Sequence, residues 1–255
     1  VRVEQPEGVR EMSINKAVFY LFLASALTVG TMLWISKRMH QKPNRVQTAM
    51  EVAYDMTKNT ITGGNMEPKM ASRWFPFLAA LFFWIWFSNM LGYLPLPTNT
   101  EHTFDLFGVE VPSFAIYAAT ANLSVTLALA LITFAATHVE GIRYNGVRRY
   151  LKSWIPEGVP GPLLALIVPL EVISQFMRLI SLSVRLFANM LAGHMLILVM
   201  LGLIFIFSSW FLIPISVVAG TVIYLFEVGI VVTIQAFVFA LLSAIYIGAA
   251  IEPEH

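Results

Sequence analysis

Two long apolar segments, 162–207 and 211–250, constrain the fold of this chain more than any other feature. A helix needs only about 20 residues to cross ~30 Å of hydrocarbon, so each segment is either two short spans or one long, strongly tilted helix. No turn-forming residues interrupt 170–192, and the polar residues of this stretch keep one helical phase. We therefore expect two long tilted helices joined by a short turn near Ser208–Pro214.

The composition places the chain in a membrane class. Of its 255 residues, 58% are hydrophobic and only 12% are charged, too few charges for a typical soluble domain of this length. The net charge of +1 gives no indication of nucleic-acid binding. Because there is no cysteine, disulfides, thiolate catalysis and cysteine-ligated metals are excluded. We expect an all-α, polytopic transmembrane protein with a single membrane domain, 1–255, and about five crossings.

Three shorter apolar stretches supply the other expected crossings. They lie at 17–36, at 74–94, which is rich in Trp and Phe, and at 113–137. Between the first two, 45–61 alternates apolar and polar residues at helical spacing. This pattern favours an amphipathic helix on the membrane surface or against a partner, with a solvated linker as the alternative.

The basic residues predict the orientation of the chain in the membrane. They are concentrated just after the first span and in loop 138–161, and the positive-inside rule puts both segments inside. The N-terminal tail, 1–16, and the acidic loop 98–112 then lie outside, and the C-terminus lies inside. The tail lacks the features of a signal peptide. Its mixed charge favours a bacterial plasma membrane over a mitochondrial inner membrane.

A stripe of polar groups follows one face of the first long helix. At about 100° per residue, Glu171 and Asn189 fall within roughly 40° of Arg185, whereas His194 lies roughly 180° away. Charged groups at membrane depth cost ~2.5–3.5 kcal/mol each on insertion scales and are usually functional. We interpret the stripe as part of an ion path. Its members are Glu171, Ser174, Gln175, Arg178, Ser181, Arg185 and Asn189.

Arg185 is the strongest single candidate in the stripe. Arginine stays protonated, so it cannot shuttle protons, but it can supply a fixed positive potential and pair with a carboxylate. Glu171 lies ~21 Å away along the helix axis and cannot be that partner. We therefore expect the partner carboxylate on another subunit. Arg178 has a structural and a functional interpretation of about equal weight, because it lies near a helix end from which it can reach water.

A second group of polar residues is expected near the outer side. His194 is either a proton relay or a buried histidine satisfied by a hydroxyl. Glu227 is surrounded by apolar residues in the last helix, so it must be neutral, paired or hydrated. Paired with His194 across the helical hairpin, it would form a carboxylate–imidazole relay. Gln235, Asn89 and Asn122 can complete the polar lining.

Enzyme motifs are absent from the sequence. It contains no GxxxxGK[ST], HExxH or GxSxG motif and no histidine pair at metal or haem spacing. We expect no catalytic site, no cofactor and no metal on this chain. The remaining alternatives are a self-contained secondary ion transporter or channel, which the lack of an internal repeat disfavours, and a structural scaffold.

The run SLSVRLFANMLAGH at 181–194 resembles the signature of the subunit a family of the rotary F-type ATP synthase. Weaker similarities extend over most of the chain. They are SNMLGYLPLP at 88–97, ATANLSVTLALAL at 119–131 and IQAFVFALLSAIYIGAA at 234–250.

This resemblance implies a stator that lies against a ring of c subunits and translocates protons through two offset half-channels. The expected partners are the c-ring, b-type subunits of the peripheral stalk, the remaining synthase subunits and lipid. Either H⁺ or Na⁺ fits as the coupling ion, since the ring carries the ion-binding carboxylate. Arg185 would face that carboxylate, with Glu171 in the inner half-channel. The resemblance places Asn189, His194, Gln235 and Glu227 in or near the outer one, and secondary lining is expected from Asn89, Asn122, Ser181, Gln175 and Arg178.

The chain departs from the family pattern at three positions. An acid usually stands seven residues before the glutamine, but Glu227 stands eight before Gln235, which rotates it by about 100° on an α-helix. Asn122 replaces a common aspartate, and Gly92 replaces an acid found in bacterial relatives. The sequence therefore does not decide which side chain contacts Glu227.

Overall fold

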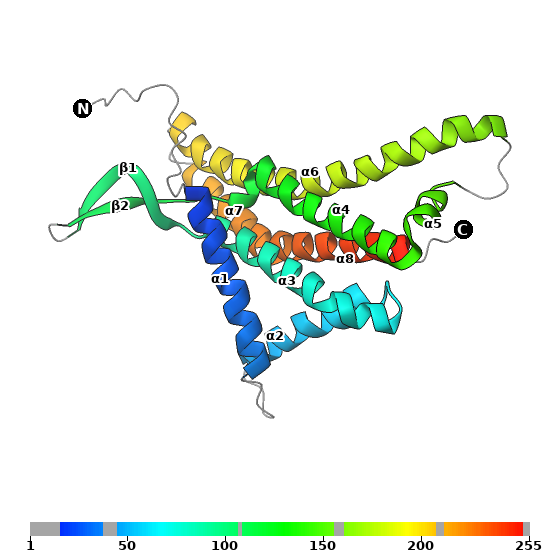
Figure 1. Ribbon diagram of the computed structural model, residues 1–255. Helices are drawn as coiled ribbons and strands as arrows, with labels where there is room; N and C mark the ends of the chain where they lie inside the picture. Colours follow the sequence, from blue (N-terminus) through cyan, green and yellow to red (C-terminus); the bar gives the residue numbers. More distant parts are fainter. Residues whose placement is uncertain (1–15, 38–44, 107–108, 156–160, 208–211, 252–255) are drawn as a thin grey trace, which may run out of the picture.

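The computed structural model describes residues 16–37, 45–106, 109–155, 161–207 and 212–251 (Figure 1). Three expectations of the sequence lie outside these residues. They concern the N-terminal tail, most of the turn near Ser208–Pro214 and the C-terminal residues 252–255.

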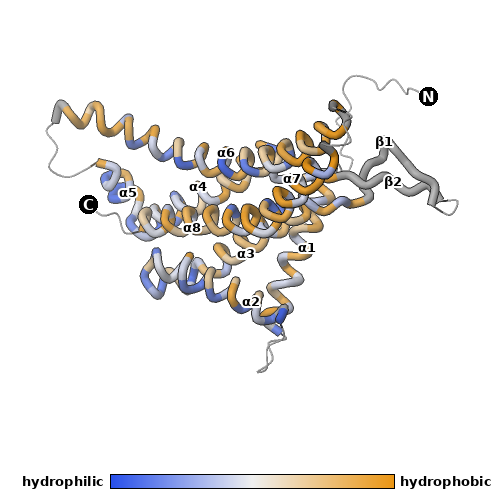
Figure 2. Tube along the Cα trace, turned by 180° about the vertical axis from the view of Figure 1, so that it is seen from behind, coloured by the Kyte–Doolittle hydropathy of each residue, from blue (hydrophilic) through white to orange (hydrophobic). Residues whose placement is uncertain are grey.

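Within the described residues, five helical segments are long and apolar enough to cross a membrane, which confirms the prediction of a polytopic helical membrane protein. Figure 2 shows hydrophobic residues along the long helices and hydrophilic ones at the short helices α5 (Val147–Lys152) and α2 (Arg45–Asp55). The first two spans are α1 (Lys16–Lys37) and α3 (Pro68–Tyr93). Helix α3 begins at Pro68, six residues before the expected 74, because proline suits the first turn of a helix.

The first long segment is one continuous helix, α6 (Gly161–Phe207), of 47 residues. At 1.5 Å per residue it is ~70 Å long, more than twice the hydrocarbon thickness. Its apolar part, Leu163–Ile204, has 42 residues and fits within ~30 Å only if the helix lies about 60° from the membrane normal. The single long helix is thus confirmed, and its tilt in the membrane stays a prediction.

The second long segment changes its winding in the middle. It consists of α7 (Leu212–Phe226), a π-helical turn η3 (Glu227–Val231) and α8 (Val232–Ile251). The expected amphipathic helix changes winding in the same way, because α2 continues as the π-helix η1 (Met56–Gly63).

The third span starts later than predicted. Helix α4 runs over Leu123–Asn145, not 113–137. The preceding residues form an antiparallel hairpin of β1 (Leu96–Leu106) and β2 (Val109–Ala115), followed by a short 3₁₀ turn, η2 (Ala119–Ala121). Pro112 has no N–H to donate and is tolerated here because both strands of a two-stranded sheet are edge strands.

The helices pack around one main core. Helix α3 packs against α1 and α8, and α4 packs against both α6 and α8. Leu78, Phe82 and Ile85 of α3 and Ala236 and Phe239 of α8 are buried in this core. The β-hairpin lies at one end of the bundle and α5 at the other (Figure 1), and we refer to these as the hairpin end and the α5 end.

Candidate functional site

Arg185 lies on a face of α6 that the other described residues leave open. Its side chain and those of Ser181 and Asn189 are exposed, one helical turn apart. Among the described residues, Arg185 makes no ion pair, whereas Arg73 of α3 pairs with the buried Glu140 of α4 at 2.9 Å. A guanidinium at membrane depth is costly unless it has a partner or water. This face of α6 is therefore suited to an anionic group from another molecule.

On the hairpin side of Arg185, α3, α6 and α8 enclose a small polar cavity of about 10 Å³. Asn189 Nδ2 donates to Gln235 Oε1 at 2.7 Å, and Tyr93 Oη donates to Glu227 Oε2 at 3.0 Å. Asn89 also lines the cavity and accepts a hydrogen bond from Thr120 Oγ1 at 2.7 Å. We call Asn89, Tyr93, Asn189, Glu227 and Gln235 the amide–carboxylate cluster.

His194 joins this cluster through Tyr93. The two rings are stacked, with centroids 4.7 Å apart. His194 Nδ1 lies 2.8 Å from the carbonyl oxygen of Met190, and Nε2 lies 2.9 Å from that of Gly92. Because a carbonyl only accepts, both contacts are hydrogen bonds only when the ring carries two protons. A direct contact between His194 and Glu227 is not found among the described residues. The Glu227 carboxylate instead accepts a hydrogen bond from Tyr93, whose ring lies between the two side chains.

Two glycines make this arrangement sterically possible. A Cβ atom at Gly193 would lie 2.7 Å from Glu227 Oε2 and would collide with Tyr93 Oη. A Cβ atom at Gly92 would lie 2.7 Å from the Cβ of Ala118. The position of Gly92 therefore has no space for a carboxylate side chain, and its backbone carbonyl faces His194 instead.

The π turn η3 accounts for the unusual spacing of Glu227 and Gln235. A π turn uses one residue more than an α turn, because its hydrogen bonds join i and i+5. The five residues Glu227–Val231 are π-helical, so the eight-residue separation again amounts to about two turns. Both side chains line the same cavity, and the rotation of about 100° expected for a regular α-helix does not occur.

Toward the α5 end, the other part of the stripe lines a larger cavity of about 630 Å³, which we call the vestibule. Gln175 Nε2 donates to Glu171 Oε1 at 2.8 Å, and the Arg178 guanidinium lies 5.5 Å from the centroid of the Tyr246 ring. The vestibule is lined by Asn65, Thr137, Tyr150, Ser153, Trp154, Glu171, Gln175, Arg178, Ile245, Tyr246, Gly248, Ala249 and Ala250.

The structure assigns some sequence candidates differently. Asn122 is exposed and caps α4, where its Oδ1 accepts from Ser124 N at 3.0 Å, so it lines neither cavity. Tyr93 and Tyr246 are additions that sequence reasoning missed. Spacing could have indicated both, since Tyr93 lies one turn after Asn89 and Tyr246 lies within roughly 20° of Gln235 on the same helix.

Comparisons with known proteins show the family of the chain. Residues 18–248 match the family model described as "ATP synthase A chain". The "ATP synthase subunit a" of Anaeromyxobacter dehalogenans is 36% identical over 247 residues, which cover 96% of this chain but 59% of that protein. Its counterparts in Rubrobacter xylanophilus and Nitrobacter winogradskyi are 35% and 34% identical, with 86% and 92% of their lengths covered. On this evidence the chain is a multi-pass membrane protein that belongs to the ATP synthase A chain family.

Proposed function

We propose that this chain is the stator half of a proton path that couples the proton-motive force to rotation of a c-ring and so to ATP synthesis. One observation carries the proposal. Arg185 is exposed and has no ion pair among the described residues, and it lies between two separate polar cavities. A carboxylate of a neighbouring ring subunit would complete the site. Membership of the ATP synthase A chain family supports this assignment.

The hairpin side provides the entry path in this proposal. The basic helix α5 marks the inner side by the positive-inside rule, so the hairpin end faces outward. A proton passes by His194 and Tyr93 to Glu227, and then by Asn189 and Gln235 to the ring carboxylate. The neutral carboxyl can then rotate into lipid, where a carboxylate would be costly.

The vestibule provides the exit path. After nearly a full rotation the carboxyl approaches Arg185, whose fixed charge favours the ionised form, and the proton leaves toward Glu171. The same charge blocks a direct leak between the two cavities. At ~150 mV each proton supplies about 3.5 kcal/mol of electrical energy.

The remaining partners and the location follow from the same assignment. The chain lies in a bacterial plasma membrane, with its N-terminus outside and its C-terminus inside, and contacts the c-ring, b-type stalk subunits and lipid. Helices α2 and η1 lie along the inner surface or against a partner.

A reconstitution experiment distinguishes this function from a self-contained channel. We expect the purified chain alone to leave liposomes impermeable to protons, because Arg185 and the two cavities form only half of a site. In liposomes that contain the complete synthase, the interior should become acidic on addition of ATP. Proton conduction by the chain alone, at a rate comparable with that of the complex, would contradict the proposal and favour a transporter or channel.

A further inference from the structure

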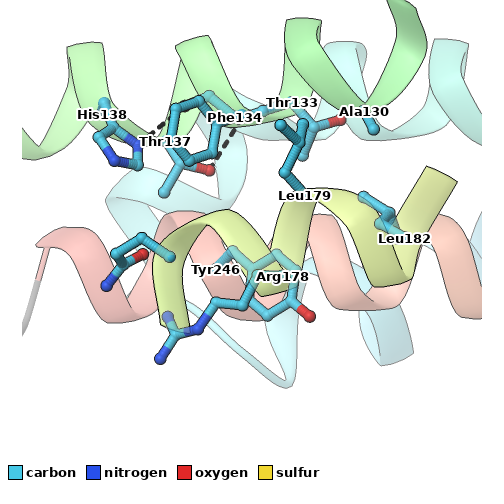
Figure 3. Close-up of a pocket in the computed structure, with 10 residues that line it drawn as sticks. Ala130, Thr133, Phe134, Thr137, His138, Arg178, Leu179, Leu182 and Tyr246 are labelled. Atoms are coloured by element: carbon cyan, nitrogen blue, oxygen red, sulfur yellow. Dashed lines mark hydrogen bonds between the residues drawn. The ribbon is translucent and has the colours of Figure 1, made fainter. Parts of the chain in front are cut away.

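A second cavity adjoins the vestibule, between α4, α6 and α8. Its volume of about 20 Å³ is enough for one water molecule. Thr137, Gln175, Arg178 and Tyr246 line both this cavity and the vestibule. Figure 3 shows His138 and Phe134 on α4 at one side of it, and Arg178 and Leu179 on α6 at the other. Because four side chains are shared, the small cavity lies directly beside the vestibule.

His138 presents an unused nitrogen here. Its Nδ1 lies 3.0 Å from the carbonyl oxygen of Phe134, one turn back on α4. A carbonyl only accepts, so Nδ1 carries the hydrogen and Nε2 is left with its lone pair. Nε2 is buried and has no hydrogen-bond partner among the described residues. Buried polar atoms without a partner are rare, and one that lines a cavity of water size is suited to exchange a proton with water.

The surroundings hold the imidazole ring in place. The Phe134 ring lies 4.0 Å from it, and the rings of Tyr150 and Trp154 lie 6.0 Å away, all measured between centroids. These contacts come from α4 itself and from the α5 region. The faces of the imidazole ring are thus packed against aromatic rings, and Nε2 has no hydrogen-bond partner among the described residues.

Other charged and titratable groups lie near His138. Arg178 of α6 stays protonated, and its guanidinium lies against the ring of Tyr246 of α8. Burial raises the pKa of the Tyr150 phenol, so this hydroxyl stays neutral. On α4, Glu140 is paired with Arg73. Imidazole is the side chain whose charge ordinarily changes in this pH range.

We propose that His138 is a proton-exchanging residue in the wall of the small cavity beside the vestibule. A hydronium ion in the small cavity transfers its proton to the Nε2 lone pair and becomes water. The imidazolium keeps its Nδ1–H bond to the Phe134 carbonyl, and Nε2 then returns the proton to a water in the small cavity. His138 thereby serves as a proton reservoir beside the exit path, and this role rests on the function proposed above.

Two substitutions separate proton exchange from packing. His138→Asn keeps an N–H donor near the position of Nδ1 but cannot carry a proton, whereas His138→Phe keeps the ring packing and removes both nitrogens. We expect ATP-driven proton pumping by the complete synthase in proteoliposomes to fall at least about fivefold in both variants, because a positioned acid–base group usually contributes more than this. Imidazole added on the vestibule side should partly restore pumping in His138→Ala.

Each outcome has a defined meaning. Wild-type pumping by His138→Phe, with no effect of imidazole on His138→Ala, would overturn the proposal and leave His138 a packing residue. The Arg185→Ala synthase, measured in parallel, keeps the two proposals distinguishable. If Arg185→Ala abolishes pumping while the His138 variants pump normally, only the role of His138 fails. If Arg185→Ala pumps normally, the proposed function itself fails.

Discussion

Replacing Arg185 by alanine is expected to abolish ATP-driven proton pumping while the headpiece continues to hydrolyse ATP. The substitution removes the fixed charge that favours the ionised ring carboxylate and that separates the two cavities. Arg185→Lys should retain only part of the pumping rate, because an ammonium keeps the charge but loses the planar donor geometry. Pumping and hydrolysis can be measured together in inverted membrane vesicles, with a pH-sensitive dye and a phosphate assay.

Arg143→Ala is the matched control for this experiment. Arg143 is an exposed arginine in the last turn of α4 and lies outside the stripe on α6. Its removal should leave coupled pumping unchanged. Coupled pumping retained by Arg185→Ala would contradict the assignment and favour a purely structural role for this chain.

Replacing Glu227 by glutamine is expected to slow proton pumping by about 10²-fold, the lower end of what acid–base groups contribute. Glutamine has nearly the same shape, and its carbonyl oxygen can still accept the hydrogen bond that Tyr93 Oη donates to Glu227 at 3.0 Å. The variant therefore removes proton exchange with little change in packing. Pumping should be normalised to the amount of this chain that co-purifies with the synthase.

Glu67→Gln provides the corresponding control, since Glu67 is an exposed carboxylate at the start of α3 and is remote from the amide–carboxylate cluster in sequence. Its pumping rate should equal that of the wild type. A Glu227→Gln synthase that pumps at the wild-type rate would show that protons enter by another route.

Sequence reasoning recovers the features that depend on local periodicity and apolar length. The polar stripe on α6 follows from spacing at about 100° per residue, and the unbroken length of α6 follows from an apolar stretch without turn-forming residues. Arg185 and Asn189 share an exposed side of α6, and Glu171 and Arg178 share the vestibule, as their helical phase predicts.

The features that sequence reasoning missed depend on contacts between distant segments. Tyr93 and Glu227 are 134 residues apart, and only the packing of α3 against the last helix brings them together. The π turn is equally hidden, because hydrophobic periodicity assumes a constant rise and twist along the helix. The β-hairpin depends on backbone pairing between β1 and β2, whereas the acidic stretch 98–112 within it predicts only a loop.

The most direct test of the central claim is a crosslink between the Arg185 face of α6 and the c-ring. The chain has no native cysteine, so single cysteines can be introduced without background. Ser181→Cys lies on the exposed face one turn before Arg185, whereas Ile180→Cys, 46% exposed in the wild type, points roughly 140° away from Arg185. With a second cysteine beside the ring carboxylate, we predict a disulfide from position 181 and little or none from position 180. Equal crosslinking from both positions, or a preference for position 180, would contradict the claim that Arg185 faces the ring.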